Sequence, residues 1–192
     1  FKHYLRLMAN AEIKIKEHGI ENIVFKKVSK FNNLYQFLLF IDRIIEGLSS
    51  FDGTLKKYGN SKNVELIFKN EQEQALLYVA KNESGVDTLT ENTSWCISQD
   101  YGSEYLGYRN QYSNNGNLTF FRLYNFFSED EDNNSVGFFN GKYNINSAYN
   151  LADKESSQVV EDFLETFDIN LSKHSIYTYE FYDDSNYEDE YE

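Results

Sequence analysis

Apolar residues recur at helical spacing in two stretches of the first third of the chain. Over residues 3–18 they lie three or four positions apart, and Gly19 follows at a place where helices commonly end in a left-handed glycine. Over residues 33–48 one continuous face is apolar, made of Leu34, Phe37, Leu38, Ile41, Ile44, Ile45 and Leu48. Residues 49–63 are rich in turn formers. The pattern predicts two helices followed by a turn-rich segment, with the boundary of the first subdomain near residues 59–63.

Beyond this boundary the apolar positions form short runs, which are typical of strands. Residues 64–68 and 75–80 flank a polar turn and predict a hairpin. Residues 118–127, 135–139 and 142–145 are separated by a charged turn and an Asn-Gly pair, which favour tight reversals. These runs predict a three-stranded antiparallel meander.

The last ordered pattern in the chain is helical again. Residues 154–167 carry apolar side chains on one side, and Asp153 precedes them as a candidate N-cap. The element order is helix, helix, hairpin, meander, helix. It predicts an α+β fold with an N-terminal helical pair, an antiparallel sheet of about five strands and a C-terminal helix.

The composition narrows the class of protein. The 192 residues contain one cysteine, which excludes an intrachain disulfide and fits a reducing compartment. There is no apolar run long enough to span a membrane, and no phosphate loop, zinc spacing or dinucleotide fingerprint, so we expect no membrane, metal or cofactor. The chain has no proline but 16 Phe and 16 Tyr. This bias indicates an A/T-rich genome, as in a low-GC bacterium or a virus infecting one.

Charge divides the chain into two unequal parts. Residues 1–62 hold 11 basic and 6 acidic side chains, a net charge of +5, whereas residues 63–192 hold 7 and 25, a net charge of −18. We therefore predict a basic helical subdomain over 1–62 and an acidic α+β domain over 63–182. Residues 183–192 carry six acids and few core formers, which predicts a disordered or partner-ordered tail.

The only tryptophan and the only cysteine, Trp95 and Cys96, lie side by side between the hairpin and the meander. A thiol hydrolase or transferase centred on Cys96 would need a base and an orienting group, for which His174 and Asp100 are candidates. A lone cysteine beside a tryptophan is more often a packing residue. We favour the structural interpretation, in which the protein is not an enzyme, and keep catalysis as an alternative.

Two charged sets are candidate contact surfaces. The acidic set would bind a protein partner, although a solvated loop and a solubilising tail are the simpler explanation: Glu129, Asp130, Glu131, Asp132, Asp183, Asp184, Glu188, Asp189 and Glu190. The basic set would contact nucleic acid, or else pair within the chain: Lys14, Lys16, Lys26, Lys27 and Lys30.

The segment around the Trp-Cys pair resembles a phage-borne domain with a Thr-x-Trp-Cys-Thr/Ser motif. The resemblance covers residues 64–137, and its positions are Thr93, Trp95, Cys96, Ser98, Tyr108 or Tyr112, Gly116 and the strand from Leu118. This chain lacks the glycine that usually precedes the threonine. The resemblance implies a phage origin and no particular reaction.

The leading hypothesis is therefore a phage-encoded acidic accessory or structural protein that acts by protein–protein interaction. Such a protein would reside in the cytoplasm of a bacterial host or in the virion. The alternatives are a nucleic-acid-contacting subunit that uses the basic helices, and the thiol enzyme. The identity of the partner and the oligomeric state stay open at this point.

Overall fold

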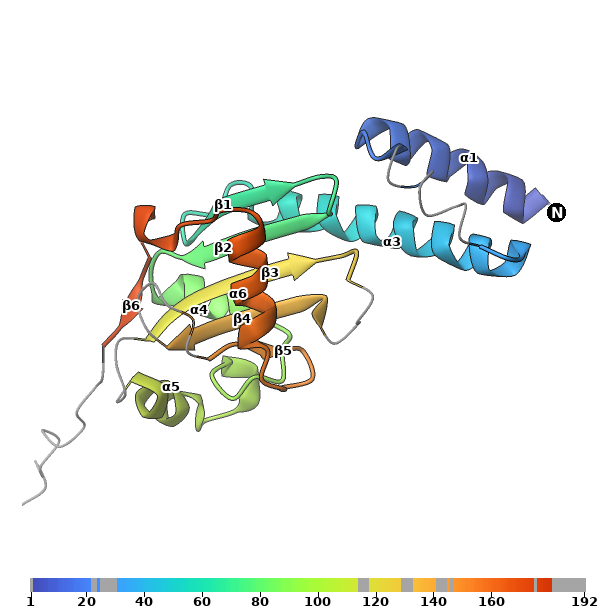
Figure 1. The fold of residues 1–192 in the computed structure, drawn as a ribbon. Helices are drawn as coiled ribbons and strands as arrows, with labels where there is room; N and C mark the ends of the chain where they lie inside the picture. Colours follow the sequence, from blue (N-terminus) through green and yellow to red (C-terminus); the bar gives the residue numbers. More distant parts are fainter. Residues whose placement is uncertain are drawn as a thin grey trace, which may run out of the picture.

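The computed structural model confirms an α+β fold in which an antiparallel sheet carries helices on both sides and a helical pair projects from one end (Figure 1). The sheet order is β1-β2-β3-β4-β5, and a sixth short strand, β6, pairs with β3. The structure describes residues 2–21, 24, 31–113, 118–128, 133–140, 145, 147–174 and 176–180.

The helical pair consists of α1 (Lys2–Glu17) and α3 (Leu34–Tyr58). Both helices run in the same direction, toward the sheet (Figure 1). Lys14 of α1 donates a hydrogen bond to Ser49 of α3 at 3.1 Å. Gly19 follows α1 with a φ of +63°, as expected of a C-terminal glycine. The two predicted helices are therefore confirmed.

The predicted turn-rich segment after Leu48 is wrong, because α3 continues as a helix to Tyr58. The continuation has a physical reason: Phe51, Leu55 and Tyr58 extend the apolar stripe of the helix at spacings of three and four. Phe51 and Tyr58 are buried in the sheet core. Burial of this stripe outweighs the turn preference of the residues between them.

The hairpin and the first part of the meander are confirmed. Strand β1 (Val64–Asn70) pairs antiparallel with β2 (Ala75–Ala80), and β2 pairs with β3 (Leu118–Asn125). Strand β4 (Ser135–Asn140) pairs antiparallel with β3. Most of the third predicted strand, residues 142–145, lies outside the described residues.

Two short strands complete the sheet. Strand β5 (Tyr149–Asn150) pairs with β4, and β6 (Thr178–Tyr179) pairs with the start of β3. Each is two residues long, which is too short for period-two alternation to be recognised in the sequence. Tertiary pairing defines these strands.

Two helices between β2 and β3 were not predicted. They are α4 (Glu83–Thr90), capped by the Asn82 side chain, and α5 (Tyr105–Ser113), which follows a 3-10 turn, η1 (Gln99–Tyr101). Both α-helices are short, and α5 is rich in tyrosine and polar residues. In Figure 1, α4 lies behind the sheet, on the side opposite α6, and α5 contacts β3.

The C-terminal helix is confirmed as α6 (Ser157–Thr166), but its predicted N-cap is wrong. Asp153 lies in a preceding turn with a φ of +57°, and the residue at the N-cap is Ser156. The apolar side of α6 packs on β1. There the ring centroid of Phe68 lies 5.4 Å from that of Phe163 and 5.1 Å from that of Phe167.

The core has two parts, and α3 belongs to both. The larger part lies around the sheet and includes Phe51 and Tyr58 of α3. The smaller part lies between α1 and the first half of α3, where it buries Ile41, Ile44 and Leu48. We call α1 together with residues 34–50 of α3 the arm, and the rest of the described chain the body.

Candidate functional site

Trp95 is fully buried against the strands of the meander, as the structural interpretation predicted. Its Nε1–H donates a hydrogen bond of 2.7 Å to the backbone carbonyl of Asn150 at β5. Its ring meets Phe138 of β4 edge-on at 6.0 Å, and a methyl group added at Gly137 would overlap the indole. The tryptophan therefore fixes the Trp-Cys segment to β4 and β5.

A buried cation completes the environment of this tryptophan. The Arg122 guanidinium lies 5.3 Å from the Trp95 ring centroid and 4.8 Å from that of Tyr124. It donates hydrogen bonds to the Ser135 hydroxyl and the Leu89 carbonyl, both at 2.7 Å. Ring faces and neutral oxygens thus replace the water that the guanidinium loses on burial.

The Cys96 thiol has the properties of a structural cysteine. It is half-buried, and burial raises the pKa of the Cys96 thiol, an effect that a hydrogen bond from the Tyr112 hydroxyl partly offsets. The negative charge of Asp153 raises the pKa further. A nucleophilic cysteine needs the opposite, a pKa lowered toward neutrality by a positive neighbour.

The other two catalytic candidates lie at different places. Asp100 accepts a hydrogen bond of 2.7 Å from the backbone N–H of Asn92, so its carboxylate caps a turn. His174 ends the 3-10 turn η3 (Leu171–Lys173) and lies 3.8 Å from the Glu65 carboxylate on β1. Among the described contacts, the side chains of Cys96, His174 and Asp100 share none with one another.

A second buried arginine, Arg109, connects α5 to α4. Its Nη2 donates to Asp87 at 2.8 Å and its Nε donates to the Ile97 carbonyl at 2.9 Å, while its guanidinium lies 4.7 Å from the Tyr105 ring centroid. Sequence reasoning missed both buried arginines. For Arg122 a signal existed, because a single charge interrupts the apolar run of a strand.

Of the five lysines proposed for nucleic acid, two are described and both have carboxylates near them. Lys16 forms an ion pair of 2.7 Å with Glu12, one turn away on α1. Lys14 lies 3.9 Å from Asp52 and donates a hydrogen bond to Ser49. Lys26, Lys27 and Lys30 lie outside the described residues.

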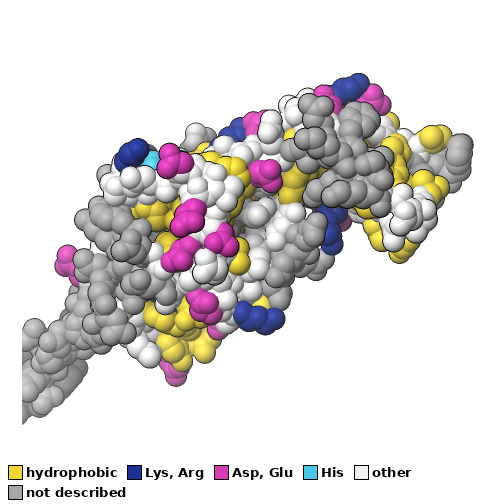
Figure 2. Space-filling model, viewed as in Figure 1, with side chains coloured by type: hydrophobic (Ala, Val, Ile, Leu, Met, Phe, Trp, Pro, Cys, Tyr) yellow, Lys and Arg dark blue, Asp and Glu magenta, His cyan; other side chains and the backbone are white. Residues whose placement is uncertain are grey.

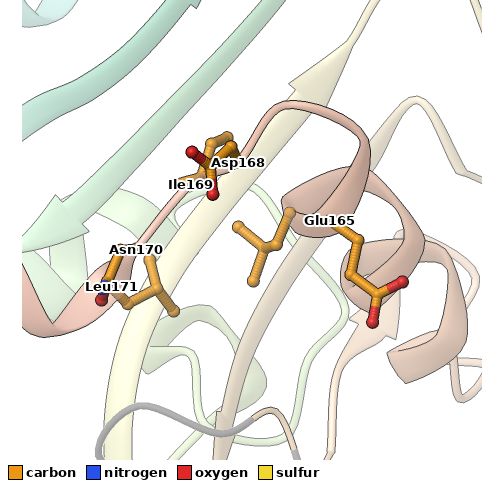
Figure 3. A pocket seen from close by; sticks show the side chains of 6 residues that line it. Glu165, Asp168, Ile169, Asn170 and Leu171 are labelled. Carbon is orange, nitrogen blue, oxygen red and sulfur yellow. The ribbon is translucent and has the colours of Figure 1, made fainter.

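The acidic residues proposed to bind a partner, Glu129 to Asp132 and Asp183 to Glu190, all lie outside the described residues. Other acids line a shallow hollow of about 310 Å³ where α6 ends (Figure 3). Figure 3 shows the Glu165 side chain pointing away from Asp168, so these two carboxylates do not converge on one point.

A second hollow, of about 400 Å³, lies between α4 and η1 and is also acidic. Its three carboxylates already have partners, because Asp87 pairs with Arg109, Glu91 with Lys57 at 2.7 Å, and Asp100 with the Asn92 backbone. Within the described part of the chain, no three His, Cys, Asp or Glu side chains are grouped as metal ligands would be. The hollows therefore offer little for a small ligand.

The arm carries the main concentration of exposed apolar side chains. Six of the eleven large hydrophobic residues that are exposed in the described chain lie on it: Leu5, Met8, Ile13, Leu34, Tyr35 and Leu39. Leu34 and Tyr35, at the tip, are each 70% exposed. Figure 2 shows apolar side chains gathered at this end of the molecule. The remaining five are scattered over β1, η1, α5, α6 and a turn.

This exposure corrects one sequence expectation. The sequence places Leu5 and Met8 at helical spacing with Ala11 and Ile15, and Leu34 on the apolar face of the second helix. The structure buries Ala11 and Ile15 but leaves Leu5, Met8 and Leu34 exposed. A helical period identifies a stripe, but it does not say whether a neighbour covers its ends.

No protein-family model, no curated protein and no solved structure matches this chain. Among the described residues, no helix is long and apolar enough to cross a lipid bilayer. What the chain does must therefore be argued from the geometry given above.

Proposed function

We propose that this is an accessory or structural protein that acts by binding another protein, and that the arm is its contact surface. The observation that carries the proposal is the gathering of six exposed large apolar side chains on two adjacent helices. A concentration of exposed apolar side chains on one part of a folded protein commonly marks an interaction site. Helical faces with such anchors are a recurrent way of recognising protein partners.

The polar groups of the body support this proposal because they hold the fold together. Its buried arginines hold α4, α5 and the Trp-Cys segment against the sheet, and the carboxylates of the larger hollow are paired. The raised pKa of the Cys96 thiol does not favour the thiol-enzyme alternative. The body is best understood as a scaffold from which the arm projects.

A phage origin, with residence in a bacterial cytoplasm or a virion, belongs to the same proposal and depends on the resemblance of residues 64–137. The nucleic-acid alternative has less support, because Lys14 and Lys16 lie beside Asp52 and Glu12. Pairing with a carboxylate lowers the local positive potential that phosphate binding requires.

The test is partner capture from a lysate of the native or infected cell, with captured proteins identified by mass. Ile13→Glu combined with Leu39→Glu should abolish capture, since each replaces an exposed apolar side chain of the arm with a charged one. The matched control, Leu66→Glu with Leu106→Glu, changes exposed leucines of the body and should leave capture intact. Thermal unfolding of each variant checks that the fold is retained.

Two further variants test the charged surfaces. Neutralising Glu129 to Asp132 together, or neutralising Lys26, Lys27 and Lys30, should change capture little if the arm dominates. Capture that survives the arm variant but fails after acid neutralisation would move the contact surface to the acidic loop. Salt-sensitive binding to DNA or RNA that the lysine changes remove would replace the proposal with the nucleic-acid alternative.

A further inference from the structure

A histidine lies between two carboxylates at the place where α1 ends. His18 directly follows α1, and its backbone N–H donates to the Lys14 carbonyl at 3.1 Å, so the residue extends the last turn of the helix. Its Nε2 lies 3.4 Å from the Asp52 carboxylate of α3, and its Nδ1 lies 3.9 Å from the Glu71 carboxylate in the turn between β1 and β2. The side chain is 11% exposed and meets the Phe51 ring edge-on at 5.9 Å. The imidazole therefore connects the end of α1 with two separate elements.

Both nitrogens of this ring have a hydrogen-bond acceptor as their charged neighbour. A neutral imidazole has one N–H donor and one acceptor nitrogen, whereas the protonated ring has two donors, and an ionised carboxylate can only accept. While the ring is neutral, one of the two carboxylates therefore lies beside a nitrogen that has no proton. Within the described part of the chain, Nδ1 of His18 is buried and has no hydrogen-bond partner. Protonation gives each nitrogen a proton with a negative group nearby, so the arrangement suits the charged ring.

Two lysines complete the charges around the ring. Lys14 Nζ lies 3.9 Å from Asp52, and Lys69 Nζ lies 2.6 Å from Glu71. The hydrogen bond from Lys69 holds the pKa of the Glu71 carboxyl below its usual range, although burial partly opposes this, so the carboxylate stays ionised near neutral pH. The lysines reduce the attraction between the carboxylates and a charged imidazole, which keeps the effect modest. The position at the C-terminal end of α1 adds to the attraction, because that end of a helix favours a positive charge.

A second polar side chain lacks partners in the same turn. Gln74 is fully buried, and among the described residues neither its Oε1 nor its Nε2 has a hydrogen-bond partner. Its amide oxygen occupies the space that a side chain at Gly47 of α3 would need. Buried polar groups without partners cost free energy. The junction of the turn with the helices is therefore a place where local opening is comparatively easy.

We propose that His18, with Asp52 and Glu71, is a pH-dependent latch that holds the end of α1 in place when the ring is protonated. An imidazole changes charge between about pH 8 and about pH 5, so the latch should close on the acidic side of neutrality and loosen as the pH rises. Loosening would let α1 separate from α3 and uncover Ala11 and Ile15, which the small core now buries. The latch would thus control how much apolar surface the arm presents. The inference goes beyond the proposed function, and its test needs no partner.

Hydrogen exchange of the full chain at about pH 6 and about pH 8 tests the inference. Exchange is followed by mass spectrometry, and each rate is divided by the intrinsic rate of an unprotected amide at the same pH. The amides of residues 11–17 in α1 should be about two- to fivefold better protected at the lower pH, which is the effect of a partly exposed ion pair. The amides of α6 should be equally protected at both pH values and provide the internal control.

Two variants remove the latch from opposite sides. His18→Gln keeps a polar side chain that cannot be protonated, and Asp52→Asn with Glu71→Gln keeps the histidine but removes both negative charges. Each should abolish the gain in α1 protection at the lower pH, and the second decides the test if His18→Gln fails to fold. The matched control is His174→Gln, because His174 also lies near a carboxylate, 3.8 Å from Glu65, but far along the chain from α1. This control should keep the full pH response of α1.

The inference is overturned if α1 is equally protected at both pH values, or if both latch variants keep the pH response. A response of the same size in α6 would overturn it as well, because acidification would then act on the whole chain through its net charge of −13. None of these results depends on partner capture, so the latch can fail while the arm remains the contact surface. Capture that survives Ile13→Glu with Leu39→Glu would overturn the proposed function and leave the latch unaffected.

Discussion

Truncation of Trp95 to alanine should be among the most damaging single changes in this protein. The side chain is fully buried, and removing a buried tryptophan side chain costs about 3–5 kcal/mol of unfolding free energy. The change also leaves the Asn150 carbonyl without its donor, at about 1–3 kcal/mol, and removes a ring that contacts the buried Arg122 guanidinium, at about 2 kcal/mol.

These three contributions cannot simply be added, because the same truncation creates the cavity and removes both the hydrogen bond and the ring contact. We therefore expect Trp95→Ala to lower the unfolding free energy by about 5 kcal/mol, at the lower end of the whole stability of a typical domain. Trp95→Phe keeps a ring in the site but lacks the N–H donor. It should cost less, though still about 1–3 kcal/mol for the unpaired carbonyl.

Urea unfolding followed by far-UV circular dichroism measures these differences without relying on the tryptophan signal. Leu106→Ala, on α5 and 42% exposed, is the control and should change the free energy by less than about 0.5 kcal/mol. A loss below about 2 kcal/mol for Trp95→Ala would refute the reasoning. It would mean that the Trp-Cys segment contributes little to holding β4 and β5.

Three further predictions concern the thiol, one glycine and the tail. Because burial raises the pKa of the Cys96 thiol, a mild thiol reagent should label it slowly at neutral pH and faster as the pH rises; rapid stoichiometric labelling at neutral pH would contradict this. Gly137→Ala should cost about 1–3 kcal/mol in urea unfolding because its methyl group overlaps Trp95, whereas Gly107→Ala, with open space around it, should be neutral or stabilising. Removal of residues 183–192 should leave the thermal midpoint nearly unchanged, and a fall of many degrees would show that the tail is structural.

The long periodic elements could be predicted from the sequence, and the short ones could not. Helices α1, α3 and α6 each carry an apolar stripe, and β2 and β3 form apolar runs bounded by polar turns. Helix α4 has eight residues with Val86 and Leu89 as its buried large side chains, so its period is hard to recognise. The second half of α3 was missed because turn formers such as Asp52 and Gly53 alternate with its apolar stripe.

The surroundings of the Trp-Cys pair show a second limit on what can be predicted from the sequence. The burial of Trp95 followed from interpreting the Trp-Cys pair as packing residues, and the structure shows Trp95 fully buried. Its partners could not be predicted, because Arg122 and Asn150 are brought to it by strands far along the chain. The exposed arm was missed for a related reason: apolar spacing is the same whether a helix face is covered or bare.

Helix α3 is uninterrupted and contributes to both cores, so the arm is attached to the body at one end and free at the other. Its amide protons should exchange with solvent most slowly near Tyr58, inside the sheet core, and progressively faster toward Leu34 at the tip. A partner that binds the tip should slow amide exchange most near Leu34, where local unfolding is easiest. Because α3 is continuous from Leu34 to Tyr58, a displacement of the helix at Leu34 would also move its end in the sheet core.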